Sequence, residues 1–369
     1  MSKAADLANL IGNINAGGGG VNRNVIINGA MNVAQRGTST TGLGADADTI
    51  PTCDRWFHSA QNTAGRFTMT QDSSAPSGFA NSIKLDCTTA DTSIAAGEVL
   101  LLRQKIEGQN VQMFAKGTSD AKPYALSFYV KANASATYVA ELMDNDNSNR
   151  HVNQTFTVGT DWSRVEISFP ADTTGAFDDD NGDSLNLNIW LHAGSTRNPA
   201  SGSTLQTTWG ALDQSRRCVG ISSFFSSTDN TFFITGVQLE VGQNPTEFEH
   251  EPYEETLKKA SRYFHKVSGA NQVMGIASYY SSSTVICNYY FPVPMRASPT
   301  LSVDLGSTGN QSFIAYSAGS TDYIDTAGLN FPNQFSCMPQ FGSGSGTAGN
   351  AAQIISQYSD QSFEFAAEL

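Results

Sequence analysis

The sequence is poor in charged residues, and its few basic side chains are scattered. Charged residues make up 15% of the 369 positions, whereas about a quarter is usual in soluble domains. The formal net charge is −13, and basic residues adjoin only in two isolated pairs, Arg216–Arg217 and Lys258–Lys259. Affinity for phosphates depends on clustered Lys and Arg. We therefore expect neither nucleic acid nor an anionic membrane surface as a partner.

Closely spaced cysteines and long apolar runs are also lacking. No two cysteines lie near enough for a CxxC metal or redox pair, so we expect buried free thiols in a protein made in a reducing cytoplasm. The first residues lack the apolar core of a signal peptide, and no run is long enough to span a membrane. The sequence thus predicts no membrane insertion and no cofactor. The cysteines are Cys53, Cys87, Cys218, Cys287 and Cys337.

Alternation of polar and apolar residues dominates residues 21–251. Strict alternation predicts strands with one buried and one solvated face, as in antiparallel sheets. Many such strands without intervening helices indicate a β-sandwich, and we predict a jelly roll. The clearest alternating runs are Leu126–Val130, Val165–Phe169, Leu185–Leu191 and Val237–Val241.

A short amphipathic helix is predicted at the start of the chain. A helix of about a dozen residues is marginal alone, so its apolar face needs something to pack on. The glycines Gly17–Gly20 follow it and form a flexible tether. The helix therefore either anchors the chain to a larger particle or folds back on its own domain. Its apolar face consists of Leu7, Leu10, Ile11 and Ile14.

The whole chain is predicted to be all-β apart from two helices. Residues 1–20 form the anchoring helix and Gly linker, and residues 21–251 form the jelly-roll domain. Residues 252–265 form a connecting helix, in which Glu254 and Lys258 are a favourable i,i+4 pair. Residues 266–369 form a second, smaller antiparallel β domain. Within it, residues 306–350 are rich in Ser, Gly and Thr and are expected to be long exposed loops.

The solvated faces of two predicted strands carry side chains that suit sugars. Sugar rings stack on flat aromatics while amides and charges bind their hydroxyl groups. Trp209 in a polar loop is a further exposed candidate. The alternative is that Trp190 and Tyr129 are covered by a loop, a neighbouring sheet or a second subunit. The strand candidates are Asn188, Trp190 and His192 on one strand, and Tyr129 and Lys131 on another.

An acidic stretch around residues 178–183 raises the question of calcium. Hard cations need several carboxylate oxygens close together, and Asp178, Asp180 and Asp183 could supply them. The register does not match an EF-hand loop, because Asp183 occupies the position that requires glycine. The simpler interpretation is an Asp/Asn/Gly turn that leads into the next strand.

The sequence contains no convincing catalytic motif. It has no G-x-S-x-G nucleophile elbow, and its five histidines show no metal-ligand spacing. Glu141 and Glu166 lie on predicted strands and could pair as glycosidase carboxylates only if the fold brings them together. We expect a protein that is not an enzyme.

Three segments stand out by their sequence and order: Asn24–Thr38, Cys53–Phe57 and Ile234–Gly242, followed by Phe248–Glu249 and by Ser261–Phe264. Together they resemble a family of tailed-bacteriophage structural proteins, the tail-fibre or carbohydrate-binding-like proteins. The resemblance spans residues 22–264 and includes the order of the motifs. It implies a jelly-roll domain, a homo-oligomer (typically a trimer) and attachment to a virion. It carries no catalytic residue to transfer.

These observations lead to three expectations for function. The leading one is a virion structural protein, a tail fibre or receptor-binding type, attached through its N-terminal helix to other virion proteins after assembly in the host cytoplasm. A capsid decoration or head-fibre protein would have the same sequence features. A module that binds host polysaccharide is the third, and a depolymerase would additionally have to cleave that polysaccharide.

Overall fold

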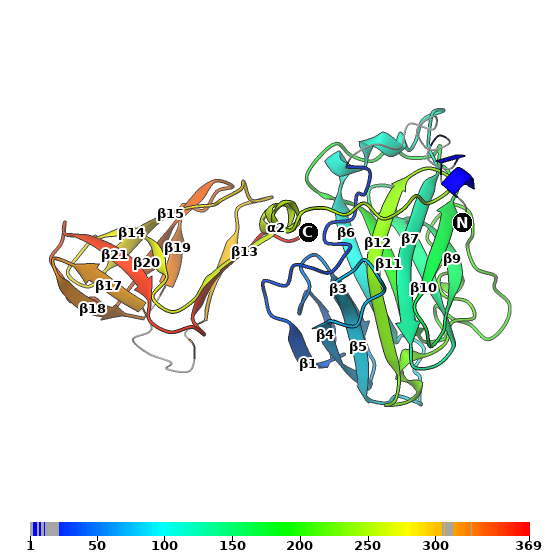
Figure 1. Cartoon of the computed structure of the whole chain (residues 1–369), viewed down its shortest axis with the longest axis horizontal. Helices are drawn as coiled ribbons and strands as arrows, with labels where there is room; N and C mark the ends of the chain where they lie inside the picture. The colour runs from blue at the N-terminus through cyan, green and yellow to red at the C-terminus, as the bar shows by residue number, and fades with distance from the viewer. Residues whose placement is uncertain are drawn as a thin grey trace. The chain divides into compact units, whose positions relative to one another are not determined.

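The computed structural model describes residues 3–5, 7–8, 11, 22–304, 306, 313–325 and 327–369 (Figure 1). The chain divides into two compact units, residues 1–256 with Leu369, and residues 257–368. Each unit is built almost entirely of antiparallel strands, as the alternation predicted. In the part of the chain that the structure describes, no helix has the length and apolarity needed to cross a membrane.

The first unit is a jelly-roll sandwich of two six-stranded antiparallel sheets. Sheet A has the strand order β1-β4-β5-β12-β7-β10, and sheet B has the order β2-β3-β6-β11-β8-β9. The strands of sheet A are β1 (Ser39–Leu43), β4 (Arg66–Asp72), β5 (Ser82–Thr89), β12 (Thr231–Val241), β7 (Tyr124–Ala132) and β10 (Ser163–Phe169). Those of sheet B are β2 (Ala47–Thr49), β3 (Phe57–Gln61), β6 (Val99–Glu107), β11 (Asp183–Ala193), β8 (Ala136–Asp144) and β9 (Arg150–Val158).

The main core lies between the two sheets and is filled by the apolar half of each alternating strand. Leu126, Phe128 and Val130 of β7 face Leu185, Leu187 and Ile189 of β11 within one cluster of fully buried side chains. Burying a large aliphatic or aromatic side chain contributes about 1.5–3 kcal/mol, so these rows dominate the stability of the unit.

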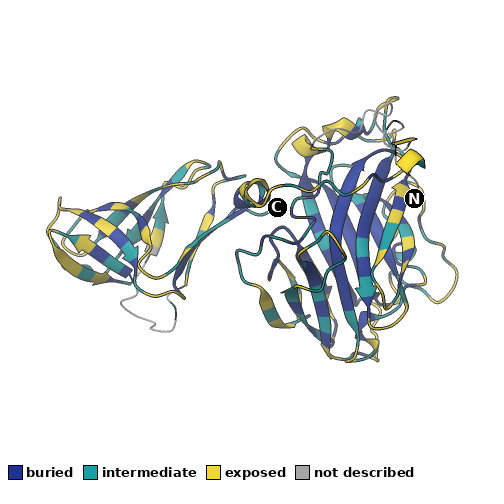
Figure 2. Ribbon diagram, viewed as in Figure 1, coloured by how far each residue is buried: buried dark blue, intermediate teal, exposed yellow. Residues whose placement is uncertain are grey.

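The expectation of a solvated outer face is wrong for β11 and β12. Every residue of β11 after Asp183 and every residue of β12 after Thr231 is buried, including the polar positions (Figure 2). The physical reason is that both outer faces are covered. Residues 194–223 lie over sheet B, and residues 243–251 lie over β12 in sheet A. Alternation alone defines two faces but does not say which is wet.

Four short 3₁₀ turns lie in the described part of the first unit, and an α-helix lies where the chain leaves it. The helix α2 spans Tyr253–Ser261, shorter than the predicted residues 252–265. Phe264 and His265 instead begin a strand, because they pair with Ala366 and Phe365. The boundary between the two units falls within α2. The 3₁₀ turns are η1 (Gly108–Asn110), η2 (Gln112–Phe114), η3 (Gln214–Arg216) and η4 (Phe224–Ser226).

The second unit contains a three-stranded and a seven-stranded antiparallel sheet. The smaller sheet has the order β13-β22-β16, and the larger has the order β18-β17-β21-β14-β15-β20-β19. The smaller sheet consists of β13 (Phe264–Ser268), β22 (Ser362–Ala366) and β16 (Thr300–Asp304). The larger consists of β18 (Ser320–Ile324), β17 (Phe313–Ser317), β21 (Ala351–Ser356), β14 (Val273–Tyr279), β15 (Val285–Tyr290), β20 (Ser336–Phe341) and β19 (Ala327–Asn330).

The prediction that residues 306–350 are long exposed loops is wrong. Four strands, β17 to β20, lie in this stretch. Inward-facing residues such as Phe313, Ile324 and Phe341 are completely buried in the core of the second unit. The strands are short, and Ser, Gly and Thr crowd the turns between them, so the composition of the stretch as a whole is that of loops.

Candidate functional site

The strand β11 carries three of the predicted sugar-binding residues, and all three are buried. Asn188, Trp190 and His192 are each at most 1% exposed. This corrects the expectation of an exposed platform, and it matches the alternative in which a loop covers the face. The covering segment is residues 194–223, which hydrogen-bonds to β9 through Asn153 N–H to the Gln206 carbonyl at 2.7 Å.

Glu141 of β8 lies at the centre of this buried layer. Its carboxylate accepts hydrogen bonds from Asn188 Nδ2 at 2.8 Å and from Trp190 Nε1 at 2.9 Å. The guanidinium of Arg217 donates from Nε at 2.8 Å and from Nη2 at 2.6 Å. His151 Nδ1 lies 3.2 Å from the same carboxylate. Glu141 is fully buried, so this network supplies the polar partners that water would otherwise provide.

Charge and packing both join Arg217 to this layer. Burial raises the pKa of Glu141, but the adjacent Arg217 charge and the hydrogen bonds from His151 and Arg217 outweigh it and hold the pKa well below its usual range. The guanidinium also lies 4.7 Å from the centre of the Trp190 ring, a cation–π contact. The ring face that a sugar would need is therefore occupied by the protein's own side chain.

His192 is held in a separate pair of contacts. Its Nε2 lies 2.9 Å from Glu98 Oε2, and its Nδ1 lies 2.8 Å from Ser223 Oγ. Its ring contacts Phe225 at 5.2 Å between centroids. Burial lowers the pKa of His192 despite the Glu98 contact. Both ring nitrogens have protein partners, so this residue serves the packing of the covering segment.

Tyr129 and Lys131 do not join the β11 residues in one site. They lie on β7 in sheet A, whereas β11 is in sheet B, so the outer faces that carry them point away from each other. Tyr129 is half-buried against Phe79, with 5.3 Å between ring centroids. The Lys131 ammonium lies 5.5 Å from the centre of the Phe233 ring. The fold therefore does not bring the two sets of predicted residues together in one site.

Trp209 is half-buried rather than displayed. Its Nε1 donates to the Pro170 carbonyl at 2.8 Å, and its ring lies 5.6 Å from that of Tyr124. The Lys116 ammonium lies 5.6 Å from the Trp209 ring centre. The Trp209 side chain packs on the edge of the main core and thereby attaches the covering segment, residues 194–223, to it.

The acidic stretch has the contacts of a turn. Asp180 Oδ1 accepts from the Gly182 amide at 2.7 Å, and the Asp178 amide donates to Asp146 Oδ2 at 3.0 Å. Burial raises the pKa of Asp183 despite the Lys105 charge. Among the residues that the structure describes, no group of three or more His, Cys, Asp or Glu side chains is arranged to hold a metal ion. The calcium hypothesis for Asp178, Asp180 and Asp183 therefore gains no support from the described residues.

The two carboxylates considered for catalysis are far apart in the topology. Glu141 lies on β8 in sheet B and is paired with Arg217, whereas Glu166 lies on β10 in sheet A. Glu166 Oε1 is 2.7 Å from Arg164 Nη1. Each carboxylate is engaged by its own arginine, and the fold does not bring the two together.

The structure describes only some of the residues that are predicted to anchor the chain. The described residues among the first eleven are helical, and Leu7 and Ile11 are 57% and 49% exposed. Leu10 and Ile14 lie outside the described residues. An exposed apolar pair at this helix is consistent with a face that packs on something else, and its partner stays a prediction.

Three of the segments that carry the family resemblance, Asn24–Thr38, Cys53–Phe57 and Ile234–Gly242, contact one another and form one belt in the first unit. The Val25 amide donates to the Leu239 carbonyl and the Val237 amide to the Gly29 carbonyl, both at 3.0 Å. Asn28, whose side chain is buried, donates to the carbonyls of Val33 and Asp54. The motifs thus hold residues 24–33 against β12, which is a scaffold role.

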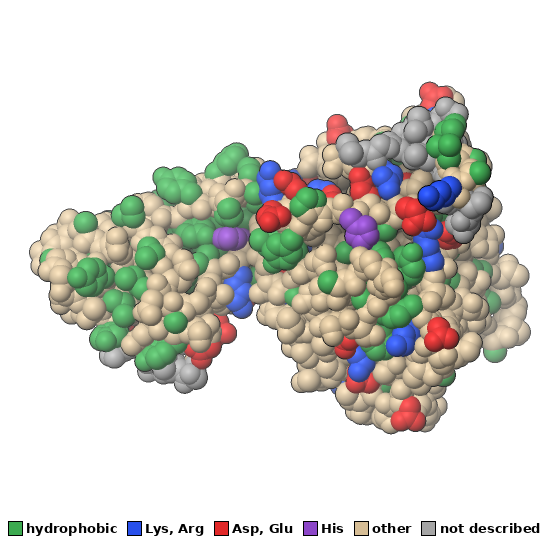
Figure 3. All heavy atoms as spheres, viewed as in Figure 1, with side chains coloured by type: hydrophobic (Ala, Val, Ile, Leu, Met, Phe, Trp, Pro, Cys, Tyr) green, Lys and Arg blue, Asp and Glu red, His purple; other side chains and the backbone are tan. Residues whose placement is uncertain are grey.

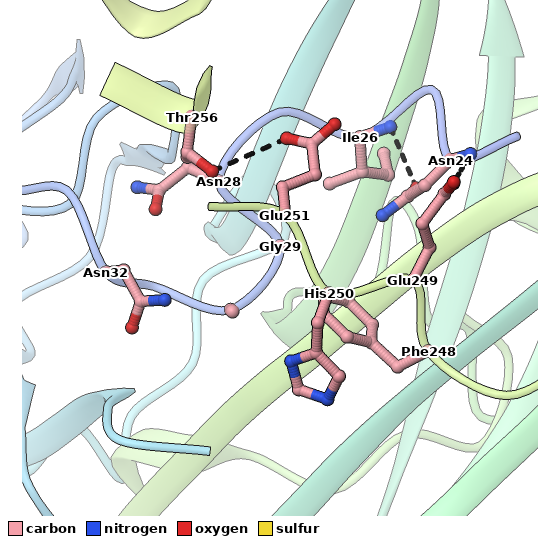
Figure 4. A pocket seen from close by; sticks show the side chains of 11 residues that line it. Asn24, Ile26, Asn28, Gly29, Asn32, Phe248, Glu249, His250, Glu251 and Thr256 are labelled. Carbon is pink, nitrogen blue, oxygen red and sulfur yellow. Dashed lines mark hydrogen bonds between the residues drawn. The ribbon is translucent and has the colours of Figure 1, made fainter. Parts of the chain in front are cut away.

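The pocket beside this belt is too small for a sugar. Figure 4 shows Asn24, Asn32 and His250 around it, with Glu249 accepting from the Asn24 amide at 3.1 Å. Its volume is about 20 Å³, room for roughly one water molecule. Two larger hollows lie elsewhere on the first unit. One, of about 430 Å³, follows β9 and β10 at Thr155–Thr157 and Ser163–Ile167, and the other, of about 200 Å³, is lined by Asn133, Tyr138 and Ser222 among others.

The second unit has an exposed surface that the sequence-based search missed. Of the eight exposed aromatic side chains in the described part of the chain, seven lie in this unit and the eighth, Tyr253, begins α2. Few charged side chains show on the visible face of the unit (Figure 3). The seven are Tyr280, Tyr290, Tyr316, Tyr323, Phe331, Phe335 and Tyr358.

Three of these tyrosines share the outer face of the seven-stranded sheet. Tyr316 of β17 and Tyr323 of β18 are 45% and 40% exposed, and Tyr290 of β15 is 75% exposed. Ile276 of β14, on the same face, is 71% exposed. The opposite face of each strand supplies the core of the unit. The available signal was the alternation in Val273–Tyr279 and Phe313–Ser317, short runs that the surrounding Ser and Gly residues obscured.

Comparisons with known proteins give fold-level similarity alone. No protein-family model matches the chain, and no curated protein matches it. A solved structure described as "CBM4 structure and function" is 11% identical, covers 58% of this chain and 97% of its own, and has a TM-score of 0.31. A family 11 carbohydrate-binding module from Clostridium thermocellum, solved with a mixed-linked tetrasaccharide, is 12% identical over 58% of this chain and 98% of its own, with a TM-score of 0.28. The enzymatically active domain of tailspike protein 4 from bacteriophage CBA120 is 12% identical over 59% of this chain and 21% of its own, with a TM-score of 0.30.

Proposed function

We propose that this chain is a structural protein displayed on a tailed-phage virion, attached through its N-terminal helix, and that it binds host-surface glycan through its second unit. The observation that carries the binding part is the partition of aromatic side chains. In the described residues 22–252, no Phe, Tyr or Trp side chain is exposed, whereas the second unit exposes seven. Exposed aromatics that could have been buried mark a surface that meets a partner.

The jelly-roll unit serves this proposal as a scaffold. Its predicted sugar-binding strand β11 is covered, and the Glu141 carboxylate at the centre of the covered layer is paired with Arg217. The residues that carry the family resemblance hold the start of the unit against β12. A unit whose central buried carboxylate is paired in this way is suited to assembly and support. The resemblance of residues 22–264 to tail-fibre and carbohydrate-binding-like phage proteins supports the virion setting, and a head-fibre or decoration protein would use the same parts.

Binding is tested with the intact chain on a glycan array. The proposal predicts selective retention of one class of bacterial surface glycan, because aromatic and amide side chains together recognise sugar faces and hydroxyl groups. A flat profile without selective retention would contradict the binding part. Incubation with the retained polysaccharide should release no reducing ends, and their release would show a depolymerase instead.

Display is tested by deleting residues 1–20. The truncated chain should remain folded and soluble but should no longer join the particle, because the exposed helix face with Leu7 and Ile11 is gone. Copy number per particle, measured on purified virions, then separates the locations: dozens to hundreds indicate head decoration, and a small multiple of three or six indicates a tail fibre. Incorporation of the truncated chain at normal stoichiometry would contradict the anchor.

A further inference from the structure

We infer that the outer face of the seven-stranded sheet is an open binding surface for an uncharged polysaccharide, which lies across the strands along a row that includes Tyr316 and Gln353. This inference rests on the proposed function and names its surface and its ligand class. The face is outlined by Tyr316, Tyr323, Tyr290 and Ile276, with amide and hydroxyl side chains between them.

The strand register places these side chains in continuous rows. Across five neighbouring strands, Thr321 pairs with Tyr316, Tyr316 with Gln353, Gln353 with Ile276, and Ile276 with Asn288. All five are exposed. Because neighbouring strands are about 4.8 Å apart, the row extends for roughly 19 Å, enough for several consecutive sugar rings.

A second row runs beside the first and is more apolar. Tyr323 pairs with Ile314, Ile314 with Ile355, and Ile355 with Val273. Tyr323 is therefore the diagonal neighbour of Tyr316, about 7–8 Å away in an antiparallel ladder. Two aromatic rings at that spacing can each stack on the CH face of a sugar, while the amide of Gln353 can bind its hydroxyl groups.

The absence of charge on this face selects the ligand class. The seven strands contain a single charged residue, Asp322. It pairs with the buried Ala315 on the core-facing side, where its carboxylate accepts from Tyr279 Oη at 2.7 Å and from Ser345 Oγ at 3.1 Å. An acidic glycan would meet no cation on the face, on a chain whose net charge is −13. An uncharged polysaccharide meets no such penalty.

The shape of the face favours an extended polymer over a small molecule. Small-molecule sites are concave and enclose most of the ligand. Here the contact groups stand on the outer face of paired strands, and the exposed fractions of Tyr316 and Ile276 leave both side chains open to solvent. A polymer chain can compensate for this shallow contact by engaging several strands at once.

The test is affinity electrophoresis of the intact chain in gels that contain dextran, mannan or the anionic polysaccharide alginate. We expect retardation by an uncharged polysaccharide, insensitive to salt because no ion pair is formed. Replacing both rings, Tyr316→Ala with Tyr323→Ala, should weaken retardation by about tenfold or more, since stacking is lost at two positions. Tyr316→Phe keeps the ring and should bind within about twofold of the parent.

Tyr358→Ala is the matched control. Tyr358 is 39% exposed, nearly the same fraction as the 40% of Tyr323. It lies after the end of β21, however, and outside the two rows. It should bind like the parent. Retardation by alginate alone, or unchanged retardation of the double variant, would overturn the inference. So would a double variant that sediments as a smaller oligomer while still binding, because the face would then join copies of the chain.

The proposed glycan binding by the chain and the assignment of the binding surface to the seven-stranded sheet can fail separately. A selective array hit that the double variant retains would leave the proposed function intact and would place the site elsewhere. Loss of the hit in the double variant, with unchanged thermal unfolding, supports both. Absence of any polysaccharide binding by the parent chain contradicts both.

Discussion

Removal of the Arg217 side chain should strongly destabilise the first unit. In the parent, Glu141 is 0% exposed and Arg217 donates two of its hydrogen bonds. Arg217→Ala leaves a buried carboxylate without its cation, a change that costs about 3–5 kcal/mol in comparable pairs. Loss of the cation–π contact with Trp190 adds to this cost. Since domains are stable by only about 5–15 kcal/mol, the effect is large.

Urea unfolding followed by tryptophan fluorescence measures this change in the first unit alone. All four tryptophans, Trp56, Trp162, Trp190 and Trp209, lie in residues 1–256, so the second unit is silent in this signal. The matched comparison is the double variant Arg217→Met with Glu141→Gln. It removes both charges while keeping an acceptor for Asn188 and Trp190, so it should be more stable than Arg217→Ala.

Acid should remove the same stabilisation. The pKa of Glu141 is depressed in the folded unit, and its unfolded value is about 4.3, so the ion pair stabilises fully above that pH. Stability should fall as the pH drops below the unfolded value toward the folded one, because the unfolded state then binds the proton first. Arg217→Ala should lose this acid dependence. A cost below about 1 kcal/mol for Arg217→Ala, as for a surface pair, would refute the reasoning.

Three further predictions concern packing, titration and thiols. Gly108→Ala should lower the free energy of unfolding of the first unit by about 1–3 kcal/mol, measured in urea, because an added Cβ would lie 1.9 Å from the Asp178 carbonyl oxygen. Gly159 has open space around it, so the unfolding free energy of Gly159→Ala should stay within about 0.5 kcal/mol of the parent. Burial lowers the pKa of His265 to about 4, so the unfolded state binds the proton of this residue first as the pH falls. The second unit should therefore lose stability as the pH falls from about 6.5 to about 4. Calorimetry should show this loss in the parent but not in His265→Gln. The five cysteines are free and buried, so a thiol reagent at neutral pH should modify none in the folded chain and all five in denaturant, and rapid modification of the native chain would be the contrary result.

The fold was largely predictable because alternation is a local signal. Each run that alternated became a strand, and one side of each, such as Leu126 and Phe128, entered the core. The strands β17 to β20 escaped detection because they are short and the turns between them are rich in Ser, Gly and Thr, the residues of loops. Inward positions such as Phe313 and Phe341 held the information, and they are sparse in that stretch.

The candidate site was less predictable because exposure is a tertiary property. Trp190 and Tyr316 occupy equivalent outward positions on alternating strands, and the sequence treats them alike. The first is covered by residues 194–223 through contacts with Arg217, a residue 27 positions away that no periodicity connects to it. The second has no cover among the described residues and is 45% exposed. Long-range coverage of this kind follows from the assembled fold.

Hydrogen–deuterium exchange of the intact chain, with and without the polysaccharide that it retains, tests the central claim most directly. The account predicts that bound polysaccharide slows exchange in peptides from β17, β18, β21 and β14, and leaves residues 194–223 and β11 unchanged. Protection confined to the jelly-roll unit, with an unchanged second unit, would contradict it.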